Sequence, residues 1–123
     1  MRLSIDDRLL RSRLTSDAEM RASWGTVADQ VQMCLALLDA AAELGDLLAF
    51  ACLSTRVVPE QGVLVTHREA TMVLRPVDRD GHQIKIDKTW PIGLPPELQD
   101  VERALILGVQ VELAVGSTSG RLR

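Results

Sequence analysis

The chain has 123 residues, a formal net charge of −3 and a pI of about 5.3, with 46% apolar and 25% charged residues. This length predicts one domain, and the acidic balance argues against strong nonspecific binding to nucleic-acid phosphates. No apolar run reaches the ~18 residues of a membrane span, and acidic residues interrupt the first apolar stretch. A cytoplasmic protein without a signal peptide is therefore expected.

Aromatic and sulfur-containing residues are few. Trp24, Phe50 and Trp90 are the only aromatic residues, so the core is expected to be aliphatic, and few side chains can stack on RNA bases. Cys34 and Cys52 are the only cysteines, and both are expected to be buried thiols. Because neither belongs to a CxxC or Cys/His cluster, the sequence predicts no metal site and no cofactor.

The N-terminal half has the pattern of one short strand followed by helices. The alternating stretch RLSI predicts a strand, and the leucines of DDRLLRSRL predict a short helix. Ser16 and Glu19 have the spacing of a capping box at the start of a second helix. Residues 26–44 carry apolar side chains at i, i+4, i+7 and i+11, which predicts an amphipathic helix that ends at Gly45. DLLAFACL then predicts a short apolar turn or helix.

From residue 56 onward the sequence is rich in valine and is interrupted by turn signals. The stretches RVV, GVLVTH and ATMVLRPV predict the strands of a meander, and DRDG predicts a turn. In HQIKID the alternation places Ile84 and Ile86 on one face. WPIGLPPELQD predicts a loop with one helical turn at residues 96–100, and RALILGVQVELAV predicts a last strand.

This order of elements predicts an α+β fold. An N-terminal strand and two helices are expected to pack on a small, mostly antiparallel sheet, because that arrangement hides the apolar faces of both layers. Residues 1–115 are expected to form a single domain, and residues 116–123 a flexible C-terminal tail.

Basic residues are unevenly distributed along the chain. Residues 26–55 contain four acidic residues and no Lys or Arg, whereas residues 56–88 contain six basic residues. An anion site is therefore expected in the second block or among the N-terminal arginines, which are Arg2, Arg8, Arg11 and Arg13.

Three stretches have an order and spacing that resemble a known family: VADQVQMCLALLDAAAELGDLLAF, ATMVLRPV and KTWPIGLPPELQDVERALILGVQVEL. They resemble, in turn, the long second helix, the central strand and the last strand of the RelE/ParE superfamily of bacterial toxins. The HigB-like branch, also described as plasmid maintenance killer proteins, is the most similar. Together the stretches span roughly residues 26–113.

This resemblance implies a metal-independent, ribosome-dependent endoribonuclease that cleaves mRNA and is neutralised by a cognate antitoxin. Such chemistry needs cations near the scissile phosphate and a group that activates the 2′-hydroxyl. The expected catalytic residues are His67, Arg68, Arg75 and Glu112, and the expected phosphate- or RNA-binding residues are Arg79, Lys85 and Lys88.

The chain also departs from the pattern of the family. The Tyr-Arg pair of the central strand falls on Ala70 and Thr71, and the Glu-Asp-Tyr-His-like end of the last strand falls on residues 110–113. Groups for stacking and proton transfer are lost there, which leaves His67 as a candidate base because histidine side chains commonly transfer protons near neutral pH.

Two hypotheses follow. The first is a toxin-like component of a bacterial toxin–antitoxin system, which is an mRNA endoribonuclease or a degenerate form of one. The alternative is a non-catalytic α+β interaction module that binds an antitoxin-like partner or self-associates as a homodimer through an exposed strand. A gyrase target in place of RNA is equally compatible with the sequence.

Overall fold

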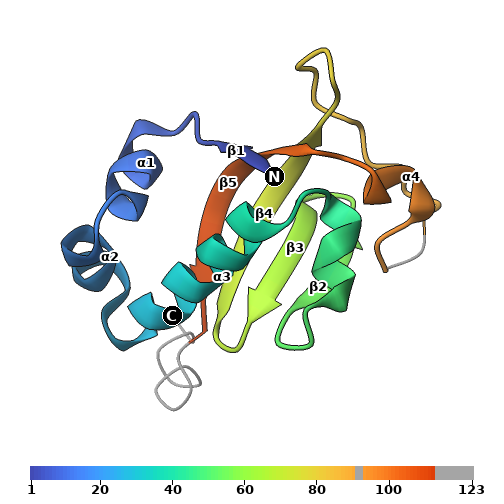
Figure 1. Cartoon of the computed structure of the whole chain (residues 1–123). Coiled ribbons are helices and arrows are strands. Elements are labelled where there is room, and N and C mark those ends of the chain that lie inside the picture. Colours follow the sequence, from blue (N-terminus) through green and yellow to red (C-terminus); the bar gives the residue numbers. More distant parts are fainter. Residues whose placement is uncertain (91–92, 113–123) are drawn as a thin grey trace.

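The computed structural model describes residues 1–90 and 93–112 (Figure 1). The predicted tail and the end of the predicted last strand lie outside these residues. In chain order the elements are β1 (Arg2–Ser4), α1 (Arg8–Leu14), α2 (Asp17–Trp24), the 3₁₀ helix η1 (Gly25–Val27), α3 (Ala28–Ala40), the 3₁₀ helix η2 (Leu44–Ala49), β2 (Ser54–Val58), β3 (Gly62–His67), β4 (Ala70–Val77), α4 (Pro96–Gln99) and β5 (Arg103–Val111).

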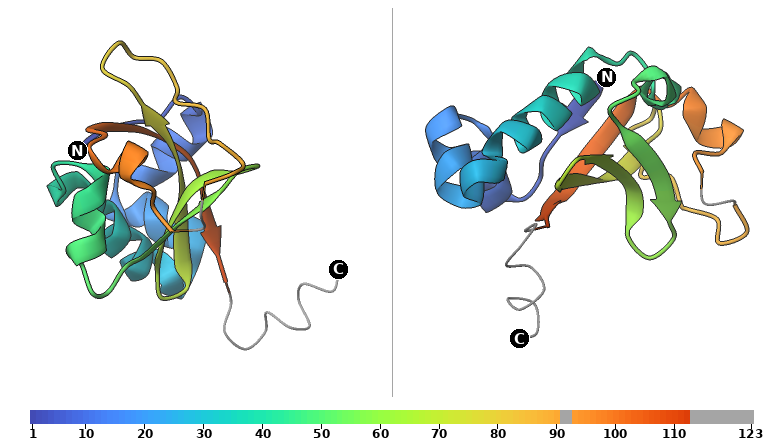
Figure 2. Two further views of the ribbon diagram at one scale, coloured as in Figure 1. Left: turned by 90° about the vertical axis from the view of Figure 1, so that its right-hand side faces the viewer. Right: turned by 90° about the horizontal axis from the view of Figure 1, so that it is seen from below.

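The strands form one open five-stranded sheet with the order β1-β5-β4-β3-β2. All neighbouring strands are antiparallel except β1 and β5, which run parallel and bring the first strand beside the last. Helices α1, α2 and α3 lie together on one side of the sheet (Figure 2). The predicted α+β class is confirmed, with helices packed on a mostly antiparallel sheet.

Alternate residues of the strands face the helices and form the core with them. On β4 these residues are Ala70, Met72 and Leu74, which are fully buried. Helix α3 supplies Leu38 and Cys34, which are also fully buried, because its apolar residues recur at helical spacing and form one stripe. This core lies between α3 and the centre of the sheet, and its buried side chains are almost entirely aliphatic.

The opposite side of the sheet carries none of α1, α2 and α3, and it is named here the open face. Leu64, Val73 and Leu105 point to it and are 2%, 8% and 7% exposed, although they do not belong to the core between sheet and helices. The turn between β2 and β3 approaches the open face closely. There the side-chain amide of Gln61 accepts a hydrogen bond of 3.4 Å from that of Gln110 on β5.

Gly62, at the start of β3, is required by this close approach. Its φ is +131°, and a Cβ atom at this position would lie 2.3 Å from the carbonyl oxygen of Leu74. Glycine adopts this φ without strain, and it alone has no Cβ atom to meet the carbonyl oxygen.

Several helix boundaries follow the predictions and one does not. Ser16 caps α2, accepting a hydrogen bond of 3.2 Å from the amide of Glu19. The prediction that the long helix continues to Gly45 is wrong, because α3 ends at Ala40. The carboxylate of Asp46 accepts hydrogen bonds from the backbone amides of residues 42 and 43, and this contact begins η2 before Gly45 is reached.

The segment after β4 is irregular. HQIKID forms no strand, and only an isolated bridge joins Gln83 to Val77. The alternation is nevertheless real, since Ile86 is buried and Lys85 is exposed. Among the described residues, no helix has the length and apolar character needed to cross a membrane.

Candidate anion-binding site

The predicted catalytic residues lie at two opposite ends of the sheet. His67 is paired with Ala70 across the β3–β4 turn, and Ala70 is paired with Val111, so His67, Arg68 and Glu112 share one end. Arg75 lies five residues further along β4 than Ala70, which is roughly 17 Å away at the rise of a strand. The four residues therefore do not form one catalytic centre.

The end with His67 is held by structural contacts. Gln30 of α3 accepts a hydrogen bond of 2.7 Å from the amide of Glu69 and donates one of 3.2 Å to its carboxylate. The amide of Glu112 donates to the carbonyl of Glu69 at 2.9 Å. The Nδ1 atom of His67 lies 3.2 Å from the carbonyl oxygen of Cys52, so it carries the proton and donates.

Arg68 belongs to the same turn and is exposed. Its φ is +56°, the only positive φ of a non-glycine residue among the described residues. The backbone conformation of Arg68 is therefore set by the two-residue hairpin turn, which requires a residue with positive φ.

Four arginines of the strands point to the open face. Each alternates with a residue that faces the helices, so its own side chain lies on the opposite side. Arg75 follows Leu74, and Arg103 precedes Ala104, both of which are core residues. The arginines of the open face are Arg2, Arg56, Arg75 and Arg103. The strands thus present four arginines and no carboxylate on the open face, in a protein whose net charge is −3.

Two of these arginines lie directly side by side. Arg2 of β1 is in register with Arg103 of β5, on neighbouring strands about 4.8 Å apart. Arg103 is in turn opposite Val77, which makes Arg75 its diagonal neighbour at about 7–8 Å. In the described chain, none of the three arginines forms an ion pair with a carboxylate. Adjacent like charges are destabilising, and a bound anion would remove that cost.

Two pockets adjoin this pair of arginines. The edge pocket has a volume of 440 Å³, and its polar and charged lining residues are Arg2, Ser4, Asp6, Gln83 and Arg103. The corner pocket has a volume of 770 Å³ and lies between the ends of β4 and β5 and the segment around α4. Arg2 and Arg103 line both pockets, so an anion held by them is reachable from either one.

Arg75 is linked to the edge pocket through Gln83. Its Nη1 atom donates a hydrogen bond of 3.4 Å to the side-chain carbonyl of Gln83, which lines that pocket. Its Nε atom is buried and has no hydrogen-bond partner in the described chain. Buried donors are usually satisfied, so Arg75 Nε is an exception, and its burial keeps it from solvent.

The predicted RNA-binding residues are distributed unevenly around the site. Arg79 lines the corner pocket and is 3.7 Å from the carboxylate of Glu102. Lys85 and Lys88 are exposed and line neither pocket as described. Of the seven predicted residues, the structure therefore brings Arg75 and Arg79 close to the candidate anion site.

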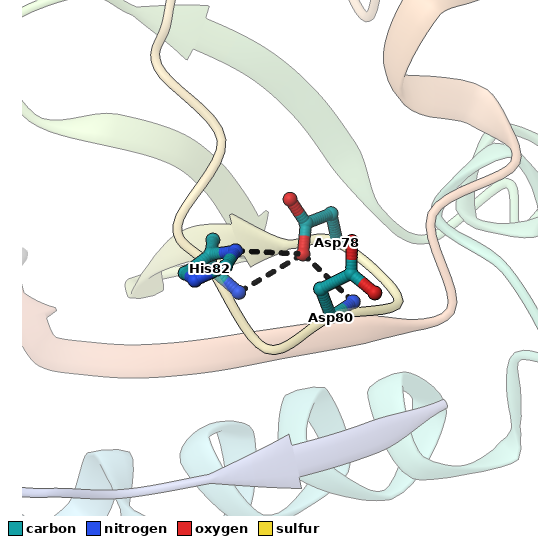
Figure 3. Close-up of side chains that lie close together, drawn as sticks. All are labelled: Asp78, Asp80 and His82. Carbon is teal, nitrogen blue, oxygen red and sulfur yellow. Dashed lines mark hydrogen bonds and ion pairs between the residues drawn. The ribbon is translucent and has the colours of Figure 1, made fainter.

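The turn after β4 adjoins both pockets and is fixed by Asp78 (Figure 3). The Oδ1 atom of Asp78 accepts hydrogen bonds of 2.9 Å from the backbone amides of His82 and Asp80. These bonds, the one from His82 foremost, hold the pKa of the Asp78 carboxyl below its usual value of 3.8. Ligand atoms of Asp78, Asp80 and His82 lie within 4.8 Å of one another. Asp78 already uses its oxygen to hold the turn.

The sequence did not single out Arg103, the central residue of the site. Arg2 was among the arginines expected near an anion, and Arg75 was expected to be catalytic. The alternation of the last strand places Arg103 opposite the core side, but its pairing with Arg2 depends on the parallel register of β1 and β5. That register joins the two ends of the described chain and has no local sequence signal.

Comparisons with known proteins find nothing similar: no family model matches the chain, no curated protein is similar to it, and no solved structure matches it.

Proposed function

We propose that the protein is a toxin-like, RNA-binding component of a bacterial toxin–antitoxin system, the role that its resemblance to the RelE/ParE superfamily implies. The observation that carries this proposal is the cluster of Arg2, Arg75 and Arg103 on neighbouring strands of the open face, without carboxylate partners in the described chain. Closely spaced guanidinium groups favour a ligand that carries phosphates, because they hydrogen-bond phosphate oxygens in pairs.

The same geometry favours the degenerate form, which binds RNA without cleaving it. Cleavage needs a group that takes a proton from the 2′-hydroxyl within hydrogen-bond reach of the reacting atoms. His67 and Glu112 lie at the opposite end of the sheet from the arginine cluster. Neither of the two histidines lines the edge or the corner pocket as described. The protein is thus proposed to hold RNA on its open face and to be bound by an antitoxin.

The proposal is tested by the binding of a labelled single-stranded RNA of about 12 nucleotides, followed by fluorescence anisotropy over a range of salt concentrations. The double variant Arg2→Gln, Arg103→Gln is expected to bind more weakly. The slope of log K against log salt is expected to fall by about 1.4, since each lost phosphate contact contributes about 0.7 for single strands. The matched control is Arg8→Gln, Arg13→Gln, which removes the same charge from exposed positions on α1.

Equal weakening of the two double variants would show that net charge, and not the cluster, governs binding. No binding by the wild type at low salt would overturn the proposal. Integrity of the bound RNA is read from the same samples on a denaturing gel.

Growth of a bacterial host under induced expression tests the absence of cleavage. The wild-type chain is expected to leave growth and bound RNA intact. Growth arrest together with cleaved RNA would instead support an active endoribonuclease. The single variants Arg68→Ala and Arg75→Ala, at opposite ends of the sheet, would then show which end carries the activity.

The alternative, a module that self-associates, is favoured by one observation on the helix side. Met33 of α3 and Leu48 of η2 are 48% and 53% exposed. Association of two chains through these side chains would remove their apolar surface from water. A mass that rises with concentration in light scattering, and that Met33→Gln with Leu48→Gln abolishes, would support this alternative. A monomer at all concentrations would exclude self-association.

A further inference from the structure

The corner pocket combines charges of both signs with an apolar wall. Its volume of 770 Å³ is within the ~300–1,000 Å³ typical of sites for small molecules. Val77, Ile84 and Val101 supply apolar surface, and Arg2, Arg79 and Arg103 supply positive charge. Four carboxylates also line the pocket, those of Asp78, Glu97, Asp100 and Glu102. A ligand that fills this pocket needs an anionic group, an apolar body and hydrogen-bond donors.

Two of the four carboxylates are free to accept hydrogen bonds from a ligand. Asp78 is used by the turn after β4, and Glu102 is near Arg79. Glu97 and Asp100 have no hydrogen bond or ion pair from their side chains in the described part of the chain. They flank the same turn of α4, which is anchored by the fully buried Leu98.

Carboxylates only accept hydrogen bonds, so they discriminate between the nucleobases. Guanine presents two adjacent donors, N1–H and N2–H, that one carboxylate can accept together. Adenine and cytosine place a ring acceptor beside their amino group, and uracil places its single donor between two carbonyl oxygens. A carboxylate repels those acceptors. A pocket with free carboxylates therefore favours guanine over the other three bases.

We propose that the corner pocket is a base-binding subsite selective for guanine, beside a phosphate held by Arg2 and Arg103. Guanine lies against the apolar wall of Val77, Ile84 and Val101, with its donor edge toward Glu97 or Asp100. The phosphate bridges the two arginines that line both pockets. This inference rests on the proposed RNA-binding function and names the nucleotide that the site takes.

The inference is tested with the mononucleotides GMP, AMP, CMP and UMP in calorimetric titrations of the full chain. GMP is expected to bind about 5–100-fold more tightly than the other three, the range of one bidentate contact to a base. The double variant Glu97→Ala, Asp100→Ala is expected to lose this preference. The control, Asp39→Ala with Glu60→Ala, removes two exposed acids outside the pocket and is expected to retain it.

Guanosine without phosphate separates the two halves of the site. The variant Arg2→Gln, Arg103→Gln is expected to weaken GMP and to leave guanosine unchanged. Equal binding of the four mononucleotides would overturn the guanine subsite, while RNA binding that depends on the arginines would still support the proposed function. A preference for GMP that survives in Glu97→Ala, Asp100→Ala would also overturn it, because other groups would then select the base. No binding of any mononucleotide to the wild type overturns the subsite as well.

Discussion

At the scale of single residues, burial separates two thiols that the sequence presents alike. Cys34 is fully buried against the sheet, whereas Cys52 is exposed, so the expectation of two buried thiols is wrong for Cys52. Cys52 follows η2 in a turn, and its carbonyl oxygen contacts His67 while its side chain faces solvent. Burial raises the pKa of the Cys34 thiol from its ordinary value of 9.0 to about 12.

The reactivity of the thiols is expected to follow this difference. At about pH 8 a disulfide reagent should modify one thiol in the native protein and two after denaturation, because the thiolate is the reacting form. Cys52→Ser should remove the native reaction. Since the folded pKa of Cys34 exceeds the ordinary value of 9.0, its protonation stabilises the fold below that pH. This contribution is lost as the pH rises toward 12. Two reactive thiols in the native protein would contradict the burial of Cys34.

Gly62 gives a second prediction at this scale. Gly62→Ala is expected to lower the free energy of unfolding by about 2–4 kcal/mol, since it adds both backbone strain and a clash with Leu74. Gly81→Ala is the control, because Gly81 also has a positive φ, of +89°, but its Cβ would meet nothing within 4 Å. Its cost is expected to be about 1 kcal/mol. Urea titrations of both variants measure the difference, and equal losses would mean that the clash is absent.

At the scale of elements, the turn that follows β4 depends on one carboxylate. Asp78 holds the amides of Asp80 and His82, and Gln83 follows directly and contacts Arg75. The fixed conformation of this turn therefore positions Gln83, which lines the edge pocket.

Acid is expected to loosen this turn before the rest of the fold. Because the folded pKa of Asp78 is lowered, its contribution to stability is present above the ordinary value of 3.8 and is lost as the pH falls through the folded pKa. The protection factor of the His82 amide, which corrects its hydrogen-exchange rate for the pH dependence of intrinsic exchange, should therefore fall in acid. Asp78→Ala should cause the same fall at neutral pH, while Asp78→Asn, which keeps an acceptor, and Asp80→Ala should not. Slow exchange in Asp78→Ala would show that other contacts hold the turn.

The elements were predictable from the sequence to the extent that local patterns determine them. Valine-rich stretches predicted β2, β3 and β4, and the Ser16 cap predicted the start of α2, because β-propensity and capping act over a few residues. The end of α3 was not predictable, since a side chain at Asp46 competes with the helix for the backbone amides. The candidate site was predictable only for Arg75, Arg79 and Arg2. Its centre depends on the long-range register of Arg2 and Arg103.

At the scale of the whole molecule, the strands differ in charge from the segment of residues 26–55. That segment carries four acids and no Lys or Arg, whereas the strands present four arginines and no carboxylate on the open face. On the helix side, α1 and α2 add Arg8, Arg11, Arg13 and Arg21. The thickness of the molecule exceeds the screening length of about 10 Å at 0.1 M salt. A polyanion at the open face is therefore screened from the acids on the helix side.

Two substitutions that each raise the net charge by one are expected to act differently. Gln110→Lys, on the open face, should tighten RNA binding about 3–10-fold at low salt. Asp39→Asn, on the outer side of α3, should change it by less than about twofold. Anisotropy titrations at matched ionic strength compare the two. Equal effects would show that RNA responds to the net charge of the molecule and not to its open face.

The parallel pairing of β1 with β5 would couple binding of the proposed anion to the integrity of the sheet edge. β1 has only three residues, and a strand this short at an edge opens readily by local unfolding. An anion that bridges Arg2 and Arg103 is released when this strand detaches, so the ligand adds its binding free energy to the cost of opening. A bound anion would thus keep β1 paired with β5. A protease that attacks the opened edge would cut the ligand-free protein faster than the ligand-bound protein.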